Sequence, residues 1–269
     1  MTSNDKKKDC LVSEESKEKS QSLYLIPKTK MSQDIIKLVF MPGLDGTGIS
    51  FELLSKFLPA DIAATVVRYP ADRLLSFEEI VACAYDQMKG EQDIVLAESF
   101  SGPVAISLIA SGRLKAKGLI LCATFAKAPR RTTLKMLRWL PLELGLKLPF
   151  QRLLLRLILG DRKAVDTLFP IWQRLKTTVP ARVLAHRIRL LSLVDVRHLL
   201  PELTIPCWYI QATGDRLLPS SVLDFVEGIP HLVVRKVTGP HFILQTEPEA
   251  SAAIINEFIN FVEKSRGQT

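Results

Sequence analysis

Apolar runs and helical patterns alternate along most of the chain. Six continuous apolar runs of five to seven residues predict buried strands, at residues 35–41, 63–68, 93–97, 118–124, 207–212 and 232–237. Apolar residues spaced three and four positions apart predict helices at residues 48–58, 76–88, 103–112 and 248–264, and Ser76 and Glu79 have capping-box spacing. Buried strands alternating with helices predict an α/β fold with a mostly parallel central sheet flanked by helices.

The alternation stops for about eighty residues, where only helical patterns rich in Leu and Arg occur. Breaks are predicted at Pro141, Pro149, Gly160, Pro170 and Pro180. We interpret residues 127–204 as a helical cap, or lid, inserted over the carboxyl edge of the sheet, where ligands bind in such folds. Residues 31–126 and 205–269 then form the core. Residues 1–30 are polar and lysine-rich, which predicts a disordered extension.

Positive charge is concentrated in the predicted cap. Residues 126–204 hold 16 Lys and Arg against 5 Asp and Glu, a net charge of +11. The rest of the chain holds 20 basic and 23 acidic residues, a net charge of −3. The excess indicates either a solvated helical surface or an attraction for an acidic partner or an anionic surface.

Composition excludes several other classes of protein. No run of 18 apolar residues is present, so no transmembrane segment is expected. The polar N-terminus lacks the apolar core of a secretory signal, and the four cysteines are far apart, so we expect a cytoplasmic protein without a metal site. The basic segment has few aromatic residues and no reader motif, which argues against nucleic-acid binding.

Residues 94–102, IVLAESFSG, predict a strand, a sharp turn and a helix with Ser99 at the apex. Such an apex is strained, so the residues two before and two after it must be small, and here they are Ala97 and Ser101. The pattern favours a nucleophile elbow. The alternative, that Ser99 only caps the following helix, is open on this stretch alone.

Two further residues complete a catalytic pattern. Asp215 follows the strand at 207–212, and His241 follows the last strand, so that Ser99, Asp215 and His241 all come after strand ends in that order. This is the order of a hydrolase triad, in which His241 accepts the Ser99 proton and Asp215 orients the imidazole. Each residue taken alone has another interpretation. Asp215 is also compatible with a turn residue, and His241 with a histidine packed in a loop.

The first loop, PGLDGTG at residues 42–48, predicts an oxyanion hole. The backbone N–H groups of Leu44 and Phe100 are the expected donors, and the glycines allow close approach of the substrate. Asp45 is interpreted as a turn residue, with orientation of this loop as the alternative. The glycine spacing does not match a dinucleotide fingerprint, so no cofactor is expected.

These motifs resemble the α/β-hydrolase superfamily over about residues 35–264. The resemblance rests on PGLDGTG, VVRYPAD, LAESFSGP, LILCATF, GD followed by LLP, and GPHFILQ. Taken together, these motifs are similar to those of a bacterial branch of small esterases. This resemblance implies hydrolysis of carboxyl esters or thioesters of short- to medium-chain acyl groups through an acyl-enzyme on Ser99. Pro42 stands where many relatives carry His, so no role of that histidine is carried over.

The cap is similar to that of pimeloyl-carrier-protein methyl ester esterases, which implies an acidic acyl carrier protein as a partner. Docking residues expected on this basis are Arg138, Arg152, Arg156, Arg187 and Arg189. Two alternatives are kept: an acyltransferase on the same fold, because both share the acyl-enzyme, and a non-catalytic ligand-binding module that uses the capped pocket.

Overall fold

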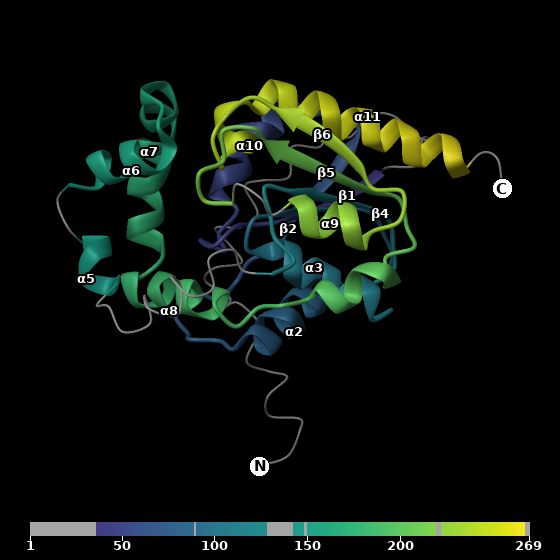
Figure 1. The fold of residues 1–269 in the computed structure, drawn as a ribbon, viewed down its shortest axis with the longest axis horizontal. Coiled ribbons are helices and arrows are strands. Elements are labelled where there is room, and N and C mark those ends of the chain that lie inside the picture. Colours follow the sequence, from purple (N-terminus) through teal and green to yellow (C-terminus); the bar gives the residue numbers. More distant parts are fainter. Residues whose placement is uncertain (1–35, 89, 128–141, 148–149, 219–221, 267–269) are drawn as a thin grey trace, which may run out of the picture.

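The computed structural model describes residues 36–88, 90–127, 142–147, 150–218 and 222–266. The extension predicted for residues 1–30 and the docking residue Arg138 lie outside these ranges. Six parallel strands form one sheet in the order β2-β1-β3-β4-β5-β6 (Figure 1). The strands are β1 (Ile36–Met41), β2 (Ile62–Val66), β3 (Gln92–Glu98), β4 (Ala116–Cys122), β5 (Cys207–Ala212) and β6 (Val233–Val237).

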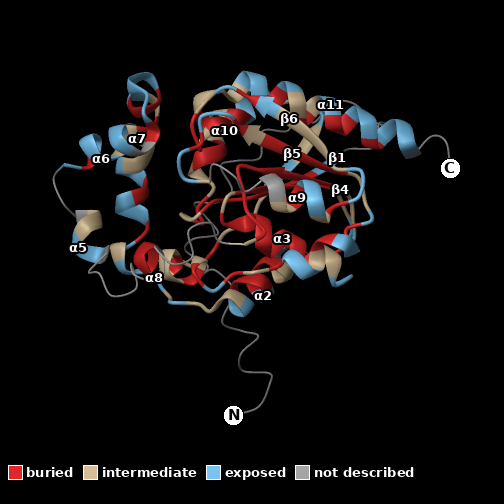
Figure 2. Ribbon diagram, viewed as in Figure 1, coloured by how far each residue is buried: buried red, intermediate tan, exposed pale blue. Residues whose placement is uncertain are grey.

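Helices cover both faces of this sheet, as the continuous apolar strands predict. Val39 and Met41 of β1 pack with α2 (Phe77–Gln87) and α3 (Ser101–Ala110) on one face. Leu38 and Phe40 pack on the other face with the C-terminal helix α11 (Pro248–Arg266). The buried residues of Figure 2 therefore follow the sheet and the inner sides of its helices. All six predicted strands are confirmed to within two residues.

The predicted helices differ from the structure in detail. The capping box of Ser76 and Glu79 forms at the start of α2. The helix predicted at residues 48–58 is instead two short 3₁₀ helices, η3 (Ile49–Glu52) and η4 (Leu54–Phe57). Such short connections suit the tighter helix, which is used in short pieces. Two short helices were not predicted: α9 (Val222–Gly228) and α10 (Ile243–Thr246). The 3₁₀ helix η5 (Arg197–Glu202) lies at the end of the segment predicted to be helical.

Within the described residues, four α-helices, here called the inserted helices, lie between β4 and η5. They are α5 (Leu142–Lys147), α6 (Gln151–Leu159), α7 (Arg162–Thr178) and α8 (Ala181–Leu191), and they stand beside the sheet in Figure 1. The break predicted at Pro170 is wrong, because α7 continues through it. A proline removes one amide donor, and the buried Leu168 and Leu175 hold the helix on both sides of it.

Candidate active site

Ser99 sits at a strained turn between β3 and α3. Its φ angle is 49°, in the left-handed region that a serine rarely adopts. Gly102 lies so close to Thr124 that a Cβ atom there would be 1.9 Å from the Thr124 Oγ1. A residue larger than glycine at position 102 would therefore clash with Thr124, because α3 approaches the end of β4 closely.

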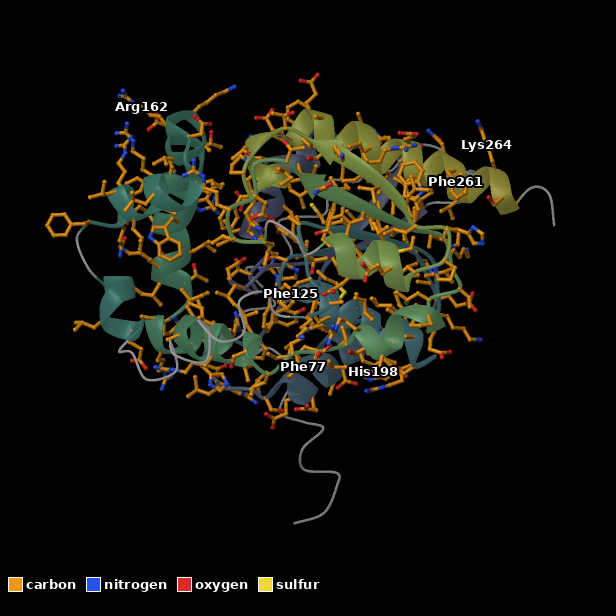
Figure 3. The ribbon with its side chains drawn as sticks, viewed as in Figure 1. Phe77, Phe125, Arg162, His198, Phe261 and Lys264 are labelled. Atoms are coloured by element: carbon orange, nitrogen blue, oxygen red, sulfur yellow. The ribbon has the colours of Figure 1, made fainter. Side chains whose placement is uncertain are left out.

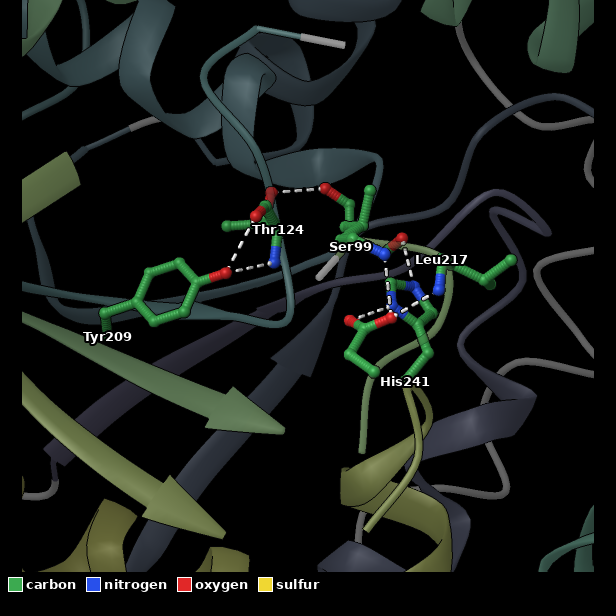
Figure 4. Close-up of polar contacts among 7 residues, drawn as sticks. Ser99, Thr124, Tyr209, Leu217 and His241 are labelled. Carbon is green, nitrogen blue, oxygen red and sulfur yellow. Dashed lines mark hydrogen bonds and ion pairs between the residues drawn. The ribbon is translucent and has the colours of Figure 1, made fainter. Parts of the chain in front are cut away.

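The Ser99 backbone is fixed from both sides. Its N–H donates to the Cys122 carbonyl at 3.0 Å, and its carbonyl accepts from Thr124 Oγ1 at 2.5 Å. Tyr209 holds Thr124 in turn, because its hydroxyl donates to the Thr124 carbonyl at 2.8 Å (Figure 4). The strained conformation is thus maintained by the neighbouring strands β4 and β5.

The structure brings Ser99, His241 and Asp215 into one hydrogen-bonded row, of which Figure 4 labels Ser99 and His241. Ser99 Oγ lies 2.9 Å from His241 Nε2, and His241 Nδ1 lies 2.7 Å from Asp215 Oδ2. The other oxygen of Asp215 accepts from the N–H groups of Leu217 and Leu218, each at 2.8 Å. This arrangement can move a proton from the hydroxyl to the imidazole while the carboxylate stabilises the imidazolium.

The loop after β1 faces Ser99. Gly46 N–H donates to the Gly43 carbonyl at 3.2 Å, which closes a turn with Leu44 and Asp45 at its centre. Within the described residues, the N–H groups of Leu44 and Phe100 donate no hydrogen bond, and both residues line the cavity beside Ser99. The Asp45 carboxylate accepts from the Thr47 N–H at 2.8 Å, as a turn residue does.

Ser101 has a role that the sequence does not reveal. Its hydroxyl donates to the Pro42 carbonyl and lies 2.6 Å from the Tyr69 hydroxyl. A glycine at this position of the elbow would be small enough, but it would not tie the loop to α3. The only signal in the sequence is the hydroxyl itself, where glycine is commonest.

A cavity of about 520 Å³ opens at Ser99, within the usual range for small-molecule sites. One wall comes from the core and includes Ser99, His241 and Phe125. Of these three residues, Figure 3 labels Phe125. The other wall comes from the inserted helices. It consists largely of the side chains Leu154, Leu155, Leu168, Ile171, Trp172, Leu175, Leu184, Ile188 and Leu191.

Glu98 is a buried carboxyl next to the nucleophile position. It is 4% exposed, and its Oε1 accepts from Gln245 Nε2 at 2.9 Å. Burial raises the pKa of Glu98 to about 7, and the hydrogen bond from Gln245 opposes this rise only in part. The Glu98 carboxyl, whose pKa is near neutrality, therefore lies on the core wall of the cavity.

The arginines expected at a docking surface fall into different environments. Arg156 is exposed, and Arg152 is exposed but paired with Asp166, whereas Arg189 is half-buried. Arg187 is only 3% exposed and donates to backbone carbonyls, so its expected role in contacting a partner is wrong. Figure 3 shows Arg162, the first residue of α7, projecting at the edge of the inserted helices.

Among the described residues, no group of three or more His, Cys, Asp or Glu side chains could hold a metal ion. Over the same residues, none of the helices combines the length and apolarity needed to cross a bilayer.

Solved structures with the same arrangement of strands and helices are hydrolases and related enzymes. The enol-lactonase of Burkholderia xenovorans superposes with a TM-score of 0.69 at 12% identity, over 86% of this chain and 94% of that one. An esterase from Thermogutta terrifontis matches with a TM-score of 0.64 at 16% identity, over 84% and 90%. The chain adopts the α/β-hydrolase fold. No family model matches the sequence.

One curated relative was found by sequence. Phytyl ester synthase 1 of Arabidopsis thaliana, a chloroplastic protein, is 28% identical over 166 residues. The matched region is 58% of this chain but 23% of the relative, so the chain spans under a quarter of that protein's length.

A bromoperoxidase from Bacillus anthracis also shares the α/β-hydrolase fold, with a TM-score of 0.66 at 16% identity over 84% of this chain and 92% of that one. The fold alone therefore does not identify the reaction.

Proposed function

We propose that this chain is a serine hydrolase that cleaves carboxyl esters or thioesters of short- to medium-chain acyl groups. The observation that carries the proposal is the hydrogen-bonded row from Ser99 through His241 to Asp215, at the wall of an apolar cavity. The esterase and lactonase neighbours support the same class of reaction.

In the proposed reaction, Ser99 Oγ attacks the acyl carbon while His241 Nε2 takes the hydroxyl proton. The electron pair of the carbonyl moves to its oxygen, where the N–H groups of Leu44 and Phe100 stabilise the negative charge. The bond to the leaving group then breaks, and His241 returns the proton to that group. Water repeats the sequence on the acyl-enzyme and releases the acid.

Replacement of the nucleophile tests this proposal. Ser99→Ala should lower kcat for p-nitrophenyl acetate and butyrate by a factor on the order of 10⁴–10⁶, because the acyl-enzyme cannot form. Ser107→Ala is the matched control, because Ser107 lies on α3 and does not line the cavity, and its hydroxyl donates to the Pro103 carbonyl at 2.8 Å. A fluorophosphonate should label the wild type and the control but not Ser99→Ala. Equal turnover by all three proteins would refute the proposal.

Acyl transfer to an alcohol is the second candidate, and the curated relative is the observation that favours it. That relative is named an ester synthase, which implies an alcohol as acceptor in place of water. Both reactions share the acyl-enzyme, so product analysis separates them. If ester product increases with added long-chain alcohol while free acid falls, the chain is a transferase.

We also propose that the acyl group arrives on an acidic carrier protein, in the manner of a pimeloyl-carrier-protein methyl ester. Arg156 is exposed on α6 beside Arg152 and supports an acidic partner there. Arg156→Glu should raise KM for a carrier-bound ester and leave KM for a p-nitrophenyl ester unchanged. Unchanged kinetics on both substrates would count against the carrier protein.

A further inference from the structure

Arg187 connects the inserted helices to the loop that follows β1. It lies on α8, and its Nη1 donates to the carbonyls of Leu44 and Asp45 at 2.9 and 2.6 Å. Its Nη2 donates to the carbonyls of Tyr69 and Pro70 at 3.4 and 3.0 Å. One buried guanidinium thus holds two loops of the core through four carbonyl oxygens.

The two carbonyls on Nη1 belong to the turn that carries a proposed oxyanion donor. The Gly43 carbonyl accepts from Gly46 N–H, so the peptide that contains the Leu44 N–H is held at one end. Arg187 fixes the next two peptides, because it binds the Leu44 and Asp45 carbonyls. With those carbonyls bound, rotation of the peptides would break a hydrogen bond to a buried cation, which is costly.

The loop is shaped to admit this side chain. A Cβ atom on Gly46 would lie 2.6 Å from Arg187 Nη1 and 2.8 Å from Tyr69 Cβ. Gly46 also has a φ angle of 70°, which a side chain would strain. The Tyr69 ring lies 5.7 Å from the guanidinium carbon, close enough for a cation–π contact. Burial lowers the pKa of Arg187, but a guanidinium remains charged in proteins.

From these contacts we propose that Arg187 is a positioning residue for the oxyanion hole, through which the inserted helices hold the Leu44 N–H in its reactive orientation. The inference rests on the proposed function, since an oxyanion hole has meaning only for acyl chemistry. Arg187 does not line the cavity, so it acts through the loop and not on the substrate. The core also holds this loop, through the hydrogen bond from the Ser101 hydroxyl to the Pro42 carbonyl.

The test compares Arg187→Met and Arg187→Lys with Arg182→Met. Arg182 is the control because it lies on the same helix, is exposed and, among the described residues, donates to the Asp72 carbonyl alone, at 3.2 Å. We expect Arg187→Met to lower kcat for p-nitrophenyl butyrate about 100-fold with KM changed little, since a small misplacement of a catalytic group has about this effect. Arg187→Lys should recover part of the loss, because an ammonium reaches fewer carbonyls. Fluorophosphonate titration corrects each rate for the fraction of folded enzyme.

A transition-state analogue separates positioning from packing. An alkyl trifluoromethyl ketone forms a hemiketal oxyanion on the serine, so its inhibition constant should rise by the factor by which kcat/KM falls. The corresponding alkyl methyl ether fills the cavity without an oxyanion, and its inhibition constant should stay the same. If Arg187→Met keeps kcat within about twofold, or weakens both inhibitors equally, the inference is overturned.

Hydrogen exchange tests the clamp independently of activity. The hydrogen-bonded amides of Gly46 and Thr47 should exchange at least 10-fold faster in Arg187→Met than in Arg182→Met or the wild type. Unchanged exchange would overturn the inference even if activity fell. If the wild type cleaves no ester and Ser99 is not labelled, the proposed function fails. Faster exchange in that case would show that the clamp exists without the oxyanion role, which also overturns the inference.

Discussion

The two walls of the cavity are built in different ways. On the core wall, Ser99 and His241 follow strand ends, and they are held by hydrogen bonds of defined length, with Asp215 behind His241. On the wall of the inserted helices, side chains such as Leu168 and Ile188 offer apolar surface without a fixed polar partner. We therefore expect substitutions of the apolar lining to change substrate selection more than the reaction itself, whereas Arg187, which does not line the cavity, connects the inserted helices to the reaction.

The largest expected effect comes from the core wall. Asp215→Asn should lower kcat about 10⁴-fold with little change in stability, because the amide no longer favours the required tautomer of His241. Asp166→Asn is the matched control on the inserted helices, since Asp166 pairs with the exposed Arg152 there. Steady-state kinetics on p-nitrophenyl butyrate measure both. A similar loss in the two variants would remove the distinction between the walls.

Glu98 gives the next largest effect, on stability. Its pKa is raised to about 7 in the folded protein from 4.5, so the folded state keeps a proton that the unfolded state has lost. Stability therefore falls as the pH rises from about 4.5 to about 7, and above pH 7 the loss reaches about 3 kcal/mol. Glu98→Gln should unfold at higher urea than the wild type at pH 8 and at similar urea at pH 4.

The control for this prediction is Glu91→Gln, on an exposed side chain that precedes the same strand. Its difference from the wild type should not depend on pH. A stability difference for Glu98→Gln that is equal at pH 4 and pH 8 would show that burial does not hold the proton on Glu98.

A smaller effect is expected on the apolar wall. Ile188→Trp fills part of the cavity, so kcat/KM for p-nitrophenyl octanoate should fall about 10-fold while the value for the acetate stays within about threefold. Leu193→Trp, at a site that is 58% exposed, should change neither. An equal loss on both esters in Ile188→Trp would indicate that this wall acts on the reaction and not on acyl length.

The smallest expected effect lies where the two regions meet. Arg174 of α7 forms two hydrogen bonds to Glu52 of η3, at 2.6 and 2.8 Å, with both side chains more than a third exposed. Glu52→Gln should lower the free energy of unfolding by about 0.5 kcal/mol at low salt, and less at 1 M NaCl. Chemical denaturation at the two salt concentrations measures it. A loss above about 2 kcal/mol would mean that this pair holds the inserted helices to the core.

Sequence patterns predicted the sheet well because buried parallel strands are continuous apolar runs. Ser99, Asp215 and His241 could be grouped because parallel strands end at one edge of a sheet, and residues after those ends are brought together. The 3₁₀ helices, the continuity of α7 through Pro170 and the helix α10 depend on tertiary packing, which overrides the weak local preferences of the sequence.

Arg187 shows the limit of sequence reasoning most clearly. In a segment of net charge +11, the sequence alone predicts that an arginine on a helix is one of many surface cations. Its burial follows from contacts with Leu44 and Asp45, which are 143 and 142 residues away along the chain. The carbonyls that it binds are present in every residue, so no side-chain motif marks the partner. The pairing of Ser101 with Pro42 was missed for the same reason.

The long reach of Arg187 also has a consequence for folding. Contacts between residues far apart in sequence form late, because the entropy of closing the intervening loop must be lost first. The turn at Gly43–Gly46 can form locally. The hydrogen bonds from Arg187 of α8 to this turn must wait until the strands between the turn and α8 in the sequence have assembled. The bond between Ser99 and His241 spans 142 residues and must wait in the same way. A refolding chain would therefore regain its sheet before it regains an ordered site.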